Sequence, residues 1–212
     1  MKAIIFDVDG TMIDTEEAVL TALQETLAEE AGMDKSMDEL HQIFGIPGKQ
    51  ALEKFGVEDV EKVRKVWVKK QQDHYDQVHV FEGIEDTLEE LKRLGVATGV
   101  VTSKTDEGVM DGFTPFGLDH YFSEIITASQ TKKHKPHPEP LLACMEKMDL
   151  QPKDTIYVGD SIFDYQCAQE AGTAFGVALW GAKSREDFEG ADYFFEKPQD
   201  ILQLVKEEKG EK

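Results

Sequence analysis

The pattern of apolar and polar residues divides the chain into two kinds of segment. A short apolar run, Ala3–Phe6, predicts a buried strand at the start of the chain. Beyond it, apolar residues recur at helical spacing, as at Val19, Leu23 and Leu27, and no convincing strand follows until about residue 80. The pattern therefore predicts an all-helical insert over residues 15–80.

From residue 81 onward, helical and strand patterns alternate. The segment IEDTLEELKRLG places Ile84, Leu88 and Leu91 on one helical face and ends at Gly95. Further strand-like runs each follow a helical segment: VATGVVTS, EIITA, TIYVG and AFGVAL. This alternation predicts an α/β fold with a Rossmann-like, doubly wound parallel sheet as its core, formed by residues 1–14 and 81–212.

Polar residues with chemistry of their own gather at the ends of the predicted strands. The first strand runs into Asp7 and Asp9, and Gly10 behind them lets the backbone turn sharply. In a parallel sheet the carboxyl ends of the strands open into one crevice, where such folds bind ligands. The other residues that this topology brings to the crevice are Thr102, Ser103, Lys135, Asp160 and Asp164.

Several carboxylates this close repel one another unless a proton or a cation lies among them. A hard divalent cation bound by oxygen atoms solves this problem, and Mg²⁺ typically takes one or two carboxylates together with a substrate phosphate. An aspartate can attack phosphorus, and a second carboxyl group can protonate the leaving alcohol and then activate water. Asp7 and Asp9 are the candidates for these two duties.

Composition and net charge limit the classes of partner that the protein can bind. The formal net charge of −20 over 212 residues argues against nucleic acid and against anionic membranes, both of which require a basic surface. No apolar run is long enough to cross a membrane, and we expect a cytoplasmic protein. Cys144 and Cys167 lie in separate helical segments with no zinc-site spacing, so we expect two buried free thiols.

Four motifs in chain order resemble the signature motifs of the haloacid dehalogenase-like phosphohydrolase superfamily: DVDGT, VTSK, KPHPEP and VGDSIFD. The insert at 15–80 resembles the inserted helical cap domain of that superfamily. The segments KPHPEPLL and GTAFGVALWGA look most like its phosphoglycolate phosphatase-like and pyrophosphatase-like branch. The resemblance spans essentially the whole chain.

This resemblance implies a role for each candidate residue. Asp7 would be the nucleophile and Asp9 the general acid and base. Phosphate would be bound by Thr102, Ser103 and Lys135. The Mg²⁺ ligands would be Asp7, Asp160 and the backbone carbonyl of Asp9, with Asp164 in support. The substrate would be a small phosphorylated metabolite, and the protein a monomer or a weak homodimer.

Two alternatives stay open at this point. A phosphomutase of the β-phosphoglucomutase type would use the same residues, although its fourth motif usually reads Glu-Asp. A non-catalytic phosphate-binding protein or a receiver-like signalling module would also combine acids, a threonine and a lysine at parallel strand ends. Within the insert, Gly45, Pro47 and Gly48 predict a turn between helices, and the adjacent Lys49 is a candidate for selecting an anionic substrate.

Overall fold

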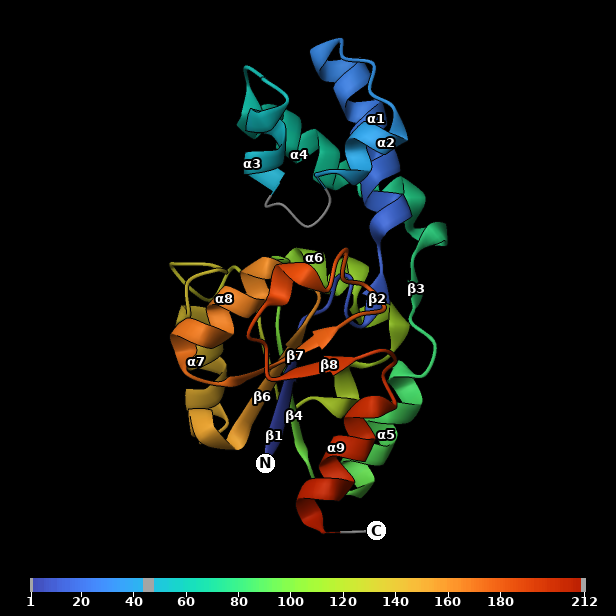
Figure 1. Ribbon diagram of the computed structural model, residues 1–212. Helices are drawn as coiled ribbons and strands as arrows, with labels where there is room; N and C mark the ends of the chain where they lie inside the picture. The colour runs from blue at the N-terminus through green and yellow to red at the C-terminus, as the bar shows by residue number, and fades with distance from the viewer. Residues whose placement is uncertain (1, 44–47, 211–212) are drawn as a thin grey trace. The chain divides into compact units, whose positions relative to one another are not determined.

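The computed structural model describes residues 2–43 and 48–210, and the chain divides into two compact units (Figure 1). One unit comprises the residues up to Asp14 together with those from Val80 onward. The other comprises Thr15–His79. Each unit has its own cluster of buried apolar side chains.

A six-stranded sheet forms the centre of the first unit, in the order β5-β4-β1-β6-β7-β8, with every adjacent pair parallel. Its strands are β1 (Ala3–Phe6), β4 (Ala97–Val101), β5 (Glu124–Ile126), β6 (Thr155–Gly159), β7 (Ala174–Ala178) and β8 (Tyr193–Phe195). The predicted α/β fold with a doubly wound parallel sheet is thereby confirmed. The central strand β1 is buried along its whole length, because helices cover both faces of the sheet.

Helices pack on the two faces in pairs (Figure 1). On one face, α7 (Glu139–Lys147) and α8 (Ile162–Ala171) contact each other and strands β4 to β7. On the other, α5 (Ile84–Arg93) packs on β4 and on α9 (Asp200–Lys209). The helix α6 (Asp106–Gly112) follows β4. The predicted apolar face of α5 is buried, and both cysteines are buried free thiols, as expected.

The second unit is helical and encloses a separate core. Its described elements are α1 (Glu16–Ala31), α2 (Met37–His41), α3 (Gly48–Lys54), α4 (Val60–Lys70) and the 3₁₀ segment η1 (Gln71–Gln77). Leu23 and Leu27 of α1 are fully buried, and Trp67 of α4 joins them in the same cluster. The Trp67 indole N–H donates to the carbonyl of Val19 at 2.9 Å, which satisfies the polar edge of this ring.

Two short strands escaped the pattern analysis. These are β2 (Ile13–Asp14) and β3 (His79–Val80), which pair as a separate two-stranded sheet. A strand of two residues contains no alternation that a sequence could display, so only the tertiary pairing reveals it.

Candidate functional site

The turn after β1 is shaped by its glycine and by the neighbouring strand. The backbone N–H of Asp7 donates to the carbonyl of Val158 at 2.9 Å, which extends the β1–β6 pairing by one residue. Gly10 adopts φ 77°, and a Cβ atom there would lie 2.3 Å from a carboxylate oxygen of Asp160. Only glycine allows this turn, since it combines a left-handed conformation with a close approach to a side chain.

Lys135 is the buried cation of the site. Its ammonium lies 2.8 Å from Asp7 Oδ1, and it donates to Asp164 Oδ1 at 2.6 Å and to Tyr157 Oη at 3.2 Å. These contacts employ all three of its N–H donors. Burial by itself lowers the pKa of Lys135, but the charges of Asp164 and Asp7 raise it above its usual value, so the side chain stays protonated.

Asp164 is held by its own helix as well as by Lys135. It is the third residue of α8, where it forms a capping box with Ser161: each residue accepts a hydrogen bond from the backbone N–H of the other. Its Oδ1 also accepts from the Tyr157 hydroxyl at 2.9 Å. Asp164 is 0% exposed, so nearly all its acceptor capacity is used inside the protein. This geometry suits a residue that positions Lys135, which in turn contacts Asp7.

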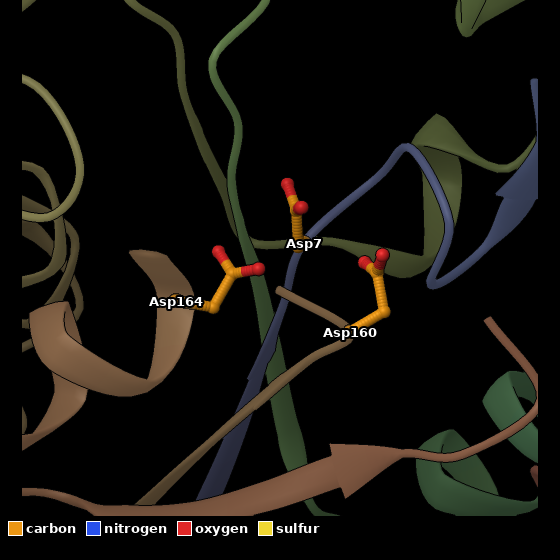
Figure 2. A group of neighbouring side chains, drawn as sticks. All are labelled: Asp7, Asp160 and Asp164. Atoms are coloured by element: carbon orange, nitrogen blue, oxygen red, sulfur yellow. The ribbon is translucent and has the colours of Figure 1, made fainter. Parts of the chain in front are cut away.

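Asp7, Asp160 and Asp164 form a cluster that could hold a metal ion (Figure 2). One carboxylate oxygen from each lies within 4.8 Å of the others. They come from the end of β1, the turn after β6 and the first turn of α8, respectively. Asp160 also accepts a hydrogen bond from the Thr11 hydroxyl at 2.8 Å, which fixes the orientation of its carboxylate.

The electrostatics of this cluster favour a bound cation. Burial, reinforced by the charge of Asp164 and opposed by Lys135, raises the pKa of Asp7 to about 7. Burial and the charges of Asp164 and Asp7 raise the pKa of Asp160 well above its usual range. One ammonium cannot neutralise three carboxylates, so the cluster requires protons or a further positive charge. An oxygen-only donor set of this kind fits Mg²⁺.

The residues after β4 lie at the same edge of the sheet as the three clustered aspartates. Thr102 is buried, and its hydroxyl oxygen accepts a hydrogen bond from the backbone N–H of Lys104 at 3.1 Å. Ser103 is exposed. The Lys104 ammonium lies 3.0 Å from Asp9 Oδ1. Lys104 is the last residue of the VTSK motif, and nothing in the sequence pattern indicated its contact with Asp9.

Other supporting residues were also missed. The Tyr157 hydroxyl lies within hydrogen-bonding distance of both Lys135 and Asp164, yet in sequence Tyr157 is one more apolar residue of a buried strand. The Trp180 indole N–H donates to the carbonyl of Thr11 at 2.9 Å, so the loop after β7 braces the Asp7 turn. Trp180 belongs to the segment GTAFGVALWGA, and no local sequence signal indicated this contact.

Lys49 is placed in the helical unit. It is exposed on α3, 3.9 Å from Glu53 one helical turn along. The predicted turn at Gly45 and Pro47 lies outside the described residues.

Among the residues that the structure describes, no helix is both long and apolar enough to cross a membrane.

Comparisons with known proteins agree with this geometry. The sequence profile of the haloacid dehalogenase-like hydrolase family matches residues 4–178. The chain is 30% identical over 208 residues to pyrophosphatase PpaX of Bacillus cereus, covering 97% of this chain and 96% of that protein.

Solved structures give the same result. A crystal structure from Lactobacillus plantarum, provisionally named a phosphoglycolate phosphatase, superposes with a TM-score of 0.90 at 31% identity, covering 96% of this chain and 98% of that one. A Haemophilus somnus protein described as a predicted phosphoglycolate phosphatase gives a TM-score of 0.81 at 26% identity, covering 97% and 98%. With its four motifs gathered at one edge of the sheet, the chain belongs to the haloacid dehalogenase-like hydrolase family.

Proposed function

We propose that this protein is an Mg²⁺-dependent phosphatase that acts on a small phosphorylated metabolite through an aspartyl-phosphate on Asp7. The observation that carries the proposal is the setting of Asp7. A buried carboxylate, 7% exposed, lies at the end of the central strand with a buried ammonium 2.8 Å away and Asp160 within the same cluster. Such a carboxylate is oriented for nucleophilic attack and needs a counter-charge when a phosphate dianion approaches.

The residues of the site divide the reaction between them. Asp7 would attack phosphorus while the carboxyl group of Asp9 gives its proton to the departing oxygen of the substrate. Lys135 and the Thr102 hydroxyl would hold the oxygens of the transferred group. In the second step Asp9, now ionised, would take a proton from water as that water attacks the aspartyl-phosphate, which frees Asp7 and inorganic phosphate.

Mg²⁺ would be held by Asp7, Asp160 and the backbone carbonyl of Asp9, with Asp164 in support. When bound, it supplies positive charge that offsets the repulsion between the carboxylates and the phosphate. Because the whole chain carries a net charge of −20, local cations must make the crevice attractive to an anionic substrate. Lys135 and Lys104 belong to this local positive charge.

The helical residues 15–80 would act as a cap domain that excludes water during phosphoryl transfer and selects the leaving group. Lys49 is the residue of this unit for which we propose contact with an anionic substrate. The relatives named pyrophosphatase and phosphoglycolate phosphatase suggest two substrates to test first, pyrophosphate and phosphoglycolate. The cytoplasmic location and the monomer or weak homodimer stay predictions.

The test is phosphate release from a panel of pyrophosphate, phosphoglycolate, sugar phosphates and nucleotides, with Mg²⁺ or with EDTA. Asp7→Asn should lower turnover at least a thousandfold, as loss of a nucleophile typically does. The exposed Asp187 lies on the same unit, and Asp187→Asn is the matched control that should retain wild-type turnover. Wild-type turnover in a verified Asp7→Asn preparation would overturn the proposal.

The same panel separates the remaining alternatives. A mutase would release little phosphate and would interconvert sugar phosphates only with a bisphosphate primer. A non-catalytic protein would bind phosphate and turn over no compound of the panel.

A further inference from the structure

Lys104 lies just after strand β4, and its side chain extends to Asp9 in the turn after β1. Its backbone N–H donates to the Thr102 hydroxyl at 3.1 Å, and its carbonyl accepts from the backbone N–H of Ala128 at 2.8 Å. The main chain of Lys104 is thereby fixed to the ends of β4 and β5. Its side chain is only 16% exposed, so its position is set by the fold rather than by solvent.

The ammonium of this side chain lies beside Asp9. The distance from Lys104 Nζ to Asp9 Oδ1 is 3.0 Å, and the Asp9 side chain is 32% exposed. The Oδ1 atom itself is buried, and among the described residues it accepts no hydrogen bond of standard geometry. The ion pair is therefore the contact that orients this oxygen atom and compensates its burial.

Lys135 already serves the other aspartates. Its donors are directed to Asp7, Asp164 and Tyr157, which leaves none for Asp9. The site thus contains two lysines with separate partners: Lys135 at Asp7 and Lys104 at Asp9.

We infer that Lys104 is a positioning residue for Asp9, holding its carboxyl group where it exchanges protons with the leaving group and with water. This inference rests on the proposed function, because it assigns Asp9 the acid and base role. Lys104 acts here through Asp9 and not by contact with the substrate phosphate.

The two steps of the reaction make this inference testable. A p-nitrophenolate leaving group departs without a proton, so phosphorylation of Asp7 by p-nitrophenyl phosphate does not need Asp9. Hydrolysis of the aspartyl-phosphate does need Asp9 to activate water. Lys104→Met should therefore give a burst of about one nitrophenolate per site, followed by a steady state roughly ten- to a hundredfold below wild type.

With phosphoglycolate, whose alkoxide leaving group requires a proton, Lys104→Met should slow the first step as well, and no burst should be seen. A merely structural disturbance of the site would slow both substrates alike. Lys153→Met is the matched control, since Lys153 is exposed and precedes β6 at the opposite edge of the sheet. Unchanged thermal unfolding would show that Lys104→Met is folded.

A double-mutant cycle decides between positioning and substrate contact. In an Asp9→Asn background, Lys104→Met should change turnover less than twofold, because its effect requires the Asp9 carboxyl group. A loss as large as in wild type, with a raised KM, would mean that Lys104 binds substrate and would overturn the inference. Wild-type turnover in Asp9→Asn would instead refute the proposed function, and with it the role of Lys104.

Discussion

Two helices in this protein begin with the same local motif in opposite surroundings. In α8 of the α/β unit, Ser161 and Asp164 form a capping box, and in α2 of the helical unit, Ser36 and Glu39 form another. In both, the serine oxygen accepts from the backbone of the third helical residue, and the acidic side chain accepts from the backbone of the serine. As local structures the two boxes are equivalent.

Their tertiary environments differ completely. Glu39 is 46% exposed and pairs with Lys35 on the protein surface, and hydrogen bonds from Lys35 and Ser36 lower its pKa to about 2. Asp164 is 0% exposed and also accepts from Lys135 and Tyr157. A helix cap of a few atoms therefore becomes part of a charged site only when other elements bring buried hydrogen-bond donors to it.

Replacing the acidic residue of each capping box by alanine should give the largest difference in stability between the buried box and the exposed one. Asp164→Ala should lower the free energy of unfolding by about 3 kcal/mol, since Lys135 loses one of its two buried counter-charges. It should also lower turnover at least tenfold, because Lys135 then keeps only Asp7 and Tyr157 as partners and its ammonium is less firmly positioned. Glu39→Ala should give a much smaller loss of stability, since solvent screens an exposed pair.

Urea unfolding at pH 8 with Mg²⁺ and phosphate-release assays measure both quantities. Equal losses of stability in the two variants would show that burial of Asp164 contributes nothing beyond its capping role.

The pH dependence of the free energy of unfolding should reveal the cost of ionising Asp7 inside the buried cluster. The pKa of Asp7 is about 7 in the folded protein and near 3.8 in the unfolded chain, so the unfolded state releases its proton first as pH rises. As pH rises from 3.8 to about 7, ionisation of Asp7 therefore lowers the free energy of unfolding. In EDTA, wild type should lose roughly 2 to 3 kcal/mol relative to Asp7→Asn between pH 5 and pH 8.

Urea unfolding of both proteins at the two pH values gives this difference directly. Mg²⁺ should reduce it, because a cation stabilises the ionised cluster. A difference that does not change with pH would mean that Asp7 is ionised throughout.

Replacing the serine of each capping box should give the smallest losses of stability, and turnover should differ between the two variants. Ser161→Ala and Ser36→Ala should each lower the free energy of unfolding by about 1 kcal/mol, the usual effect of losing a helix cap. Only Ser161→Ala should also lower turnover, since one oxygen of Asp164 loses its hydroxyl donor. Turnover and urea unfolding of both variants test this, and an unimpaired Ser161→Ala enzyme would limit the role of this box to helix stability.

Much of the architecture could be read from the chain. The alternation after residue 81 predicted the parallel sheet, and the spacing of Leu23 and Leu27 predicted a helix. These succeed because periodicity directly reflects which face of an element is buried. The two-residue strands β2 and β3 could not be predicted, because pairing at that length depends on segments far apart in sequence.

For the site, the amino-acid pattern alone shows which acids and lysines stand at strand ends, since a parallel sheet brings all its carboxyl ends to one edge. Asp7, Asp160 and Asp164 lie together for this reason. The contacts that each of these side chains makes follow from the three-dimensional packing. That Lys135 contacts Tyr157, and that Lys104 contacts Asp9, depends on side-chain directions and on how elements far apart in sequence pack together. A linear pattern specifies which face a residue occupies, whereas an ion pair requires two atoms within a few ångströms, and only the packed fold fixes that distance.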